Sequence, residues 1–161
     1  MMESLNDIGV AEDTDKACLT HRGSHHYTDI YELLFRKYKD AGPAILEIGV
    51  LDGGSIRMWA RYFPRVLVTA IDVNDRINFE DHPKVEFIQG DAYSDEVIDK
   101  LQGRSFNIII DDGDHQLASQ KIFVQRYSPM LADGGILIVE DVVLKEDALE
   151  LKKSVPDGFN S

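Results

Sequence analysis

Acidic side chains with a nearby histidine occupy two short segments that each follow an apolar run. The segment Asp111–His115 (DDGDH) follows one run, and the pair Glu140-Asp141 follows another. If these runs form neighbouring strands, Asp112, Glu140 and Asp141 converge. Carboxylates a few ångströms apart raise one another's pKa unless a cation neutralises them. Oxygen ligands without cysteine favour Mg²⁺, Ca²⁺ or Mn²⁺ over zinc, so the sequence predicts a site for a hard cation.

The histidine of the first segment, His115, follows Asp112 by three residues and is close enough to share that site. A neutral imidazole accepts a proton near pH 7, including a proton from a hydroxyl that a cation has acidified. We therefore predict His115 as the catalytic base. The alternative is a residue at the start of a helix that only hydrogen-bonds a neighbour.

A glycine-rich segment earlier in the chain, Leu46–Ser55 (LEIGVLDGGS), is typical of a strand, a tight turn and a helix start. This is the first half of a βαβ unit that holds a nucleotide-like ligand. Gly49 allows turn torsions that strain other residues, and Gly53 and Gly54 allow a ligand close to the backbone. Asp72 ends a second apolar run 23 residues after Gly49, where such folds bind ribose hydroxyls.

Apolar runs and amphipathic stretches alternate over most of the chain, which predicts an α/β fold with a doubly wound, mostly parallel sheet. Each acidic cluster then lies at the carboxyl end of a strand, where open α/β sheets bind ligands. We expect strands at Ala44–Val50, Val66–Ile71, Val85–Gln89, Phe106–Ile110 and Gly135–Val139, and helices at Tyr27–Tyr38, Ser55–Tyr62, Asp95–Leu101 and Gln116–Leu131.

The length and composition describe one domain with an ordinary core, of 161 residues and 43% hydrophobic side chains. A net charge of −12 argues against a nucleic-acid partner and leaves a small-molecule substrate. The single cysteine fits a reducing cytoplasm, and no apolar run reaches the roughly 18 residues of a membrane span. Residues 1–25 are polar without a sustained period, so we expect a loop-like arm before a domain at 26–161.

The spacing E-x-G-x-x-x-G-G differs from the dinucleotide pattern G-x-G-x-x-G. It resembles the first motif of class I methyltransferases that use S-adenosylmethionine (SAM). From about Thr14 to Val142 the chain resembles the metal-dependent sugar O-methyltransferases of macrolide biosynthesis and the related cephalosporin-hydroxylase-like and rhamnosyl O-methyltransferase proteins. The matching motifs are Thr14-Asp15-Lys16 with His26-Tyr27 and Tyr31, LEIGV with GGS and Trp59, DDGDH with Asp114 in place of a serine, and Asp133-Gly134-Gly135 with Ile138–Asp141.

This resemblance implies a SAM-dependent O-methyltransferase that acts on a hydroxyl of a sugar or other small metabolite in natural-product biosynthesis. It implies Mg²⁺ held by Asp112, Glu140 and Asp141, with His115 as the base, which agrees with the roles inferred from spacing. It also places Thr14-Asp15-Lys16 over the SAM site. The predicted SAM-binding residues are Glu47, Gly49, Ser55, Asp72, Asp91 and Ala92, to which we add Gly53 and Asp111 from the same segments.

Two alternatives stay open at this point. An NAD-dependent oxidoreductase shares the βαβ turn and Asp72, although the glycine spacing and Glu47 weigh against it. The second alternative is a non-catalytic SAM-binding fragment, because the class I methyltransferase domains that this chain resembles have two further strands after the fifth, at the edge of the sheet. We therefore expect a domain truncated at its C-terminus. Its uncovered sheet edge favours pairing into a homo-oligomer.

Overall fold

A five-stranded parallel sheet forms the centre of the computed structural model, which describes residues 3–20, 24–75 and 82–159. The strand order is β3-β2-β1-β4-β5, so the predicted doubly wound sheet is confirmed. Only the start of β5 differs clearly from the prediction, because it pairs irregularly with β4 around Phe106. The strands are β1 (Ala44–Ile48), β2 (Leu67–Asp72), β3 (Val85–Gln89), β4 (Phe106–Asp111) and β5 (Leu131–Val139).

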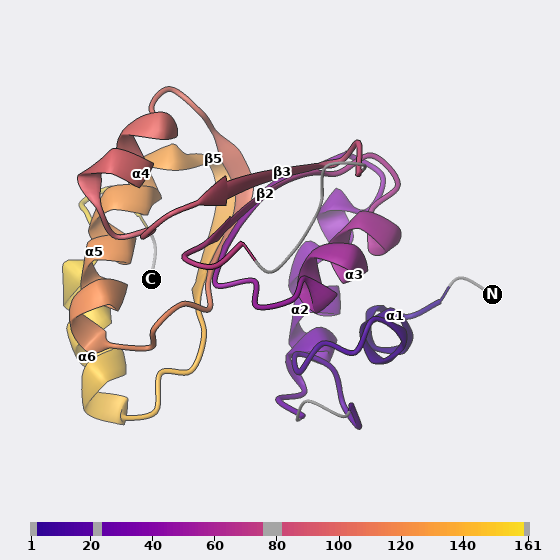
Figure 1. Cartoon of the computed structure of the whole chain (residues 1–161). Coiled ribbons are helices and arrows are strands. Elements are labelled where there is room, and N and C mark those ends of the chain that lie inside the picture. The colour runs from indigo at the N-terminus through magenta and orange to yellow at the C-terminus, as the bar shows by residue number, and fades with distance from the viewer. Residues whose placement is uncertain (1–2, 21–23, 76–81, 160–161) are drawn as a thin grey trace.

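Helices cover both faces of this sheet (Figure 1). One layer holds α1 (Leu5–Ala11), α2 (Tyr27–Phe35) and α3 (Gly54–Tyr62). The other layer holds α4 (Asp95–Lys100), α5 (Leu117–Tyr127) and α6 (Lys145–Ser154). Two short 3₁₀ helices, η1 (Arg36–Tyr38) and η2 (Ser128–Met130), follow α2 and α5. The helix expected to reach Leu131 changes to 3₁₀ geometry after Tyr127, where Pro129 supplies no backbone N–H for an α-helical bond.

Two hydrophobic cores result from the alternation of side chains along the central strands. Ile45 and Ile108 point into the core beneath α1, α2 and α3. Leu46 and Ile109 point into the core beneath α4, α5 and α6. Near-continuous apolar strands suit a parallel sheet that is buried on both faces. By the same alternation, Glu47 of β1 faces the α3 side, which decides its contacts below.

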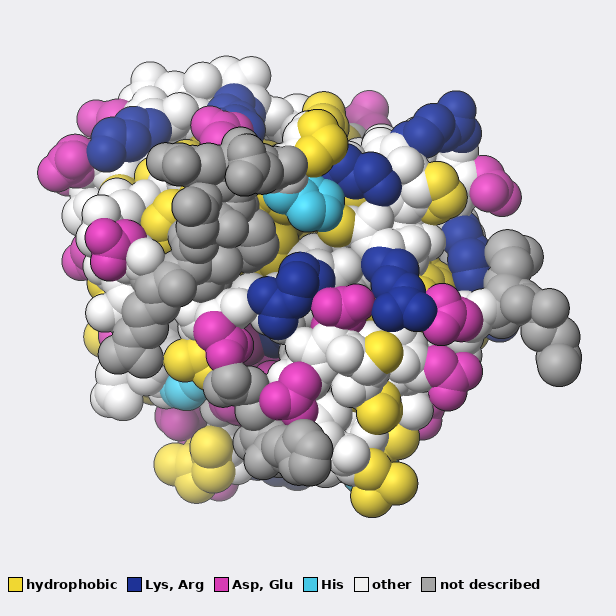
Figure 2. All heavy atoms as spheres, turned by 45° about the vertical axis from the view of Figure 1, so that its right-hand side comes forward, with side chains coloured by type: hydrophobic (Ala, Val, Ile, Leu, Met, Phe, Trp, Pro, Cys, Tyr) yellow, Lys and Arg dark blue, Asp and Glu magenta, His cyan; other side chains and the backbone are white. Residues whose placement is uncertain are grey.

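The expected loop-like arm at the N-terminus is wrong for its first part, which forms α1. Ser4 and Asp7 make a capping box at the start of this helix, and its Leu5 and Ile8 side chains are buried. The helix packs on α3, where Arg61 reaches Glu3 at 2.6 Å. Figure 2 shows basic and acidic side chains side by side on this face of the molecule. The division into residues 1–25 and 26–161 remains a prediction.

After β5 the described residues 140–159 contain α6 and no further strand. Helix α6 packs against α5 and places Leu151 in the core on that side. Within the described ranges no helix is long and apolar enough to span a bilayer.

Candidate functional site

A cavity of about 790 Å³ lies at the carboxyl ends of the strands. This is the edge at which open α/β sheets bind their ligands. Its walls are the turn after β1, the ends of β2 and β3, the loop after β4, and the segment Asp13–Lys16. Five of the predicted cofactor residues line it, namely Gly49, Ser55, Asp72, Asp91 and Ala92. The remaining three, Glu47, Gly53 and Asp111, are not among its lining residues.

Close backbone packing shapes the turn after β1. Gly49 has a φ of 75°, and a Cβ built on it would lie 1.9 Å from the carbonyl oxygen of Asp112. No other residue type fits there, because both the torsion and the space exclude a side chain. Gly53, with a φ of 79°, stands at the N-cap of α3 and directs the chain into that helix. The two glycines therefore bring the turn against the loop that carries Asp112.

Asp72, at the end of β2, orders the same turn through its carboxylate. Its Oδ2 accepts hydrogen bonds from the backbone N–H groups of Val50, at 3.0 Å, and Leu51, at 3.1 Å. Its Oδ1 accepts from the N–H of Asn74 at 2.8 Å. The side-chain amide of Asn74 also lies 3.3 Å from Oδ1, so each carboxylate oxygen already has two donors, and a ribose hydroxyl would have to replace one of them. Its predicted contact with ribose hydroxyls remains a prediction.

Glu47 is fully buried and binds protein groups on the α3 side of the sheet. Its carboxylate accepts hydrogen bonds from Ser55 Oγ, at 2.6 Å, and from the indole N–H of Trp59. Burial raises the pKa of this carboxyl, and the ammonium of Lys16, 3.6 Å away, opposes that shift. In this structure Glu47 ties the start of α3 to β1.

Asp111 is also buried, on the opposite face of the sheet. Its Oδ1 accepts hydrogen bonds from the Tyr93 hydroxyl, at 2.7 Å, and from the N–H of Gly113. Burial raises the pKa of Asp111 to about 6. These contacts fix the loop after β4, and the predicted role of Asp111 in cofactor binding is untested.

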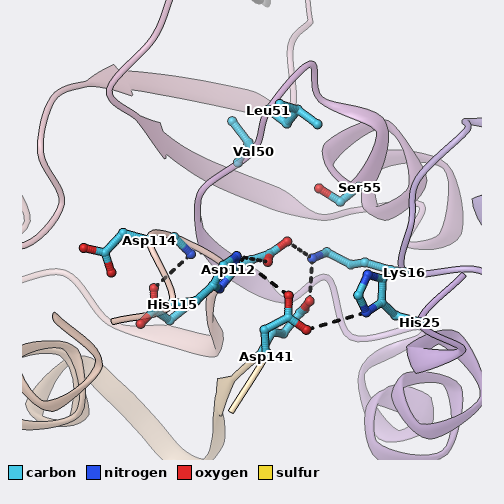
Figure 3. A network of polar contacts seen from close by, with 12 residues as sticks. Lys16, His25, Val50, Leu51, Ser55, Asp112, Asp114, His115 and Asp141 are labelled. Atoms are coloured by element: carbon cyan, nitrogen blue, oxygen red, sulfur yellow. Dashed lines mark hydrogen bonds and ion pairs between the residues drawn. The ribbon is translucent and has the colours of Figure 1, made fainter. Parts of the chain in front are cut away.

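Asp112, His115 and Asp141 meet beside the cavity, as the two acidic segments of the sequence predict (Figure 3). One ligand atom from each lies within 4.8 Å of the others. His115 Nε2 is 3.9 Å from Asp112 Oδ1 and 3.7 Å from Asp141 Oδ2. Both His115 and Asp141 have positive φ, at 57° and 53°, a conformation uncommon outside glycine. This donor set fits a divalent cation that prefers oxygen and accepts imidazole.

Glu140, the third predicted metal ligand, points to a different partner. Its Oε2 lies 2.8 Å from Nζ of Lys16, and its Oε1 accepts a hydrogen bond from the Tyr31 hydroxyl. Burial raises the pKa of Glu140 to about 8, and the attraction of Lys16 opposes that shift. Both carboxylate oxygens are thus already hydrogen-bonded, and coordination of a cation by Glu140 stays a prediction.

Sequence reasoning missed the contacts of Lys16 with the carboxylates of this site. The side chain of Lys16 is 1% exposed, and its Nζ also bonds Asp112 Oδ2 at 2.5 Å. Burial acts to lower the pKa of Lys16, but the attraction of Glu140, Glu47 and Asp112 raises it well above its ordinary value. The resemblance placed Lys16 over the cofactor site, and the segment does line that cavity. A buried cluster of carboxylates that requires a counter-charge was the available signal.

Two further contacts complete the surroundings of the cluster. Asp141 Oδ1 accepts a hydrogen bond from the Tyr27 hydroxyl at 2.7 Å and lies 3.5 Å from His25 Nδ1. Asp114 faces away from Asp141 (Figure 3). Its carboxylate accepts hydrogen bonds from the N–H of Gln116 and from Ser119 Oγ, at 3.0 and 2.7 Å. The residue that replaces the usual serine therefore binds the start of α5, whose N-cap is Gln116.

A family model described as a methyltransferase domain matches residues 46–142, which include the glycine turn, Asp112, His115 and Asp141. The chain belongs to this family. The predicted family resemblance is thereby confirmed, and with it the class I methyltransferase form of the fold.

Curated relatives in this family include sugar O-methyltransferases. Mycinamicin VI 2''-O-methyltransferase of Micromonospora griseorubida is 34% identical over 127 residues, which cover 73% of this chain and 32% of that protein. The 8-demethyl-8-alpha-L-rhamnosyl tetracenomycin-C 2'-O-methyltransferase of Streptomyces olivaceus is 34% identical over 129 residues, or 74% of this chain and 34% of that protein. The chain spans about a third of the length of these relatives.

Solved structures of methyltransferases are also similar to this chain. MycE methyltransferase from the mycinamycin biosynthetic pathway, in complex with Mg and SAH, superposes with a TM-score of 0.77 at 30% identity. The match covers 88% of this chain and 40% of that one. The fibrillarin of Aeropyrum pernix, with a TM-score of 0.58 at 19% identity, shares the fold.

Proposed function

We propose that this chain is the SAM-binding part of an O-methyltransferase that acts on a hydroxyl of a sugar or other small metabolite. One observation carries the proposal: Asp112 and His115 line the 790 Å³ cavity and, with Asp141, form a compact cluster of potential cation ligands. The cavity that would hold the methyl donor therefore lies next to His115, a side chain that can accept a proton. The named activities of the relatives, which are sugar O-methylations, support the same reaction.

SAM would occupy the 790 Å³ cavity, with its ribose at Asp72 and with Asp91 and Ala92 among the residues around it. The absence of a side chain at Gly49 lets the turn approach the ligand, and Asp72 already holds that turn in place. The segment Asp13–Lys16 lines the cavity as well. A wall that excludes water and fixes the donor lowers the barrier to transfer by orientation.

Mg²⁺ fits the cluster of Asp112 and Asp141, with Glu140 as the further predicted ligand; when bound, it would acidify a coordinated hydroxyl. We propose that His115 receives the proton of the acceptor hydroxyl at Nε2. Transfer of a methyl group to a neutral hydroxyl builds positive charge on oxygen unless that proton leaves. The carboxylates of Asp112 and Asp141, both within 4 Å of this nitrogen, would stabilise the imidazolium that forms.

The wider setting of the protein follows from the same proposal. We propose a small-molecule acceptor, no nucleic-acid partner, a cytoplasmic location and assembly into a homo-oligomer. The net charge of −12 disfavours phosphate backbones. Strand β5 pairs on one side, with β4, among the described residues, so its other edge is available for pairing.

Calorimetry with SAM, with NAD as the control ligand, tests the donor. We expect saturable SAM binding and none for NAD; tight NAD binding would favour an oxidoreductase. Transfer of a labelled methyl group from SAM to simple rhamnosides, with and without EDTA, tests the reaction. SAM binding without transfer to any acceptor would favour the alternative of a non-catalytic SAM-binding fragment. This alternative matters because the chain spans only about a third of the length of its relatives.

A further inference from the structure

Each of the two carboxylates in the candidate cation cluster has one oxygen bound to a donor of the protein. Asp112 Oδ2 accepts a hydrogen bond from Nζ of Lys16 at 2.5 Å. Asp141 Oδ1 accepts one from the Tyr27 hydroxyl at 2.7 Å. Both donors come from segments that precede β1, whereas the carboxylates follow β4 and β5. The N-terminal part of the chain therefore contacts one oxygen of each carboxylate.

The second oxygen of each carboxylate faces His115. Nε2 of His115 lies 3.9 Å from Asp112 Oδ1 and 3.7 Å from Asp141 Oδ2. In Figure 3, Lys16 lies on one side of the two carboxylates and His115 lies on the other. A cation among these three cluster residues would therefore meet one oxygen of each carboxylate.

The donor on the first oxygen hinders a cation from binding both oxygens of one carboxylate. The Lys16 ammonium is 1% exposed, so water screens its charge poorly and it repels a cation that approaches Asp112 Oδ2. The Tyr27 hydroxyl occupies a lone pair of Asp141 Oδ1, and that bond must bend or break before the oxygen turns to a metal. Glu140, the further predicted ligand, is restricted similarly, because both of its oxygens accept hydrogen bonds.

Divalent cations differ in how they use carboxylates. Ca²⁺ takes about six to eight oxygen ligands and often binds both oxygens of a carboxylate, whereas Mg²⁺ requires an octahedron and retains several waters beside one or two carboxylates. We propose that Lys16 and Tyr27 select Mg²⁺ over Ca²⁺ by holding Asp112 and Asp141 to one ligand oxygen each. This inference rests on the proposed function, because it names the residues that choose the cation of that same site.

The affinities of the whole chain for the two ions test the selection without any turnover. The protein is titrated with MgCl₂ and, separately, with CaCl₂ at equal ionic strength in a calorimeter. We expect Mg²⁺ to bind at least about fivefold more tightly, because Ca²⁺ would lack the second carboxylate oxygens that it uses in other sites.

Tyr27→Phe removes one of the two restraints and retains the aromatic ring. Because this change frees Asp141 Oδ1, it should reduce the preference for Mg²⁺ by about fivefold, mainly through tighter binding of Ca²⁺. Tyr62→Phe is the matched control, since the Tyr62 hydroxyl donates to Glu32, which is not one of the cluster residues. The control should leave the preference within about twofold of wild type.

Lys16→Met removes the other restraint. Loss of a buried ammonium strengthens the binding of every cation, so the ratio of the two affinities is the readout. We expect this ratio to fall by about fivefold or more, measured at a temperature at which the unfolding curve shows the variant to be folded. If Lys16→Met does not fold, Tyr27→Phe decides the question alone.

Three results would overturn the selection and leave the cation site in place. They are tighter wild-type binding of Ca²⁺ than of Mg²⁺, an unchanged ratio in Tyr27→Phe, and an equal fall of the ratio in Tyr62→Phe. A wild-type chain that binds neither ion would overturn the cation part of the proposed function, and this inference with it. The two failures are therefore distinguishable from the wild-type titrations.

Discussion

The Nζ atom of Lys16 lies 2.8 Å from Oε2 of Glu140, although 124 residues separate the two in the chain. The same nitrogen bonds Asp112, so one ammonium joins the N-terminal segment to the ends of β4 and β5. The segment that covers the cavity and the carboxylates beside the cation site are therefore held by a single buried charge.

Lys16→Met should destabilise the fold by about 3–5 kcal/mol, because it leaves buried carboxylates without their counter-charge. Unfolding in urea measures the loss. Lys84→Met is the control, since Lys84 donates to the carbonyl of Ala60 outside the site; its loss should be about 1 kcal/mol. Lys16→Met combined with Glu140→Gln should recover part of the stability. Equal losses in the two single lysine variants would contradict this account.

The sheet could be predicted from the sequence because its strands are short apolar runs bounded by turn residues. β3 was predicted to the residue, and β1, β2 and β4 to within two. The position of the cavity could be predicted from the ends of these strands, because parallel strands place their carboxyl ends at the same edge of a sheet. Gly49, Asp72, Asp91 and Asp112 accordingly line one cavity.

The missed features depend on tertiary contacts rather than on local pattern. Helix α1 has only seven residues, too few for a stable helix in isolation, and the packing of Leu5 and Ile8 stabilises it. Lys16 is buried only because residues 96 and 124 positions away supply its partners. Glu47 and Asp111 occupy strand positions that point into the layers of helices, so their side chains face away from the cavity.

Gly49→Ala should destabilise the protein far more than Gly103→Ala, although the two glycines have nearly the same φ, at 75° and 77°. A Cβ at position 103 meets no atom within 4 Å, so only the torsional cost of about 1–2 kcal/mol applies. At position 49 the Cβ would overlap the Asp112 carbonyl. Thermal unfolding compares the two variants. Similar melting temperatures would mean that the turn and the β4 loop are not in contact.

Asp72→Ala should weaken SAM binding by about 1–3 kcal/mol, because ribose hydroxyls and the N–H groups of Val50 and Leu51 lose their acceptor. Asp75→Ala, three residues further along the same loop, is the control and should bind SAM normally. Calorimetry gives both affinities. Unchanged binding in Asp72→Ala would remove the ribose assignment.

Mg²⁺ in excess should raise the melting temperature, because a ligand of the folded state at about 100 times its Kd adds about 2.7 kcal/mol of stability. Asp141→Asn should abolish the rise, since asparagine tolerates the positive φ of this position but supplies no charge. Asp133→Asn, an exposed change in β5, is the control. If Glu140→Gln also abolishes the rise in melting temperature, Glu140 is a ligand of the cation. An unshifted wild-type protein at millimolar Mg²⁺ would contradict the site.

His115→Ala should lower turnover by roughly 10²–10⁴-fold, because the acceptor loses the base that removes its proton. SAM affinity should stay near wild type, since the imidazole lies towards Asp112 and Asp141, at the edge of the cavity. His26→Ala is the control, because His26 contacts Ser24 and none of the three cluster residues.

Three measurements on His115→Ala separate its possible roles. Lost turnover with an intact Mg²⁺-dependent rise in melting temperature identifies the base. Loss of that rise as well identifies a metal ligand, which the position of Nε2 between two carboxylates also permits. A parallel loss of SAM binding would mean that the side chain, at its strained φ of 57°, holds the loop after β4 in shape. Full activity would leave His115 as the helix-start residue that the sequence offered as the alternative.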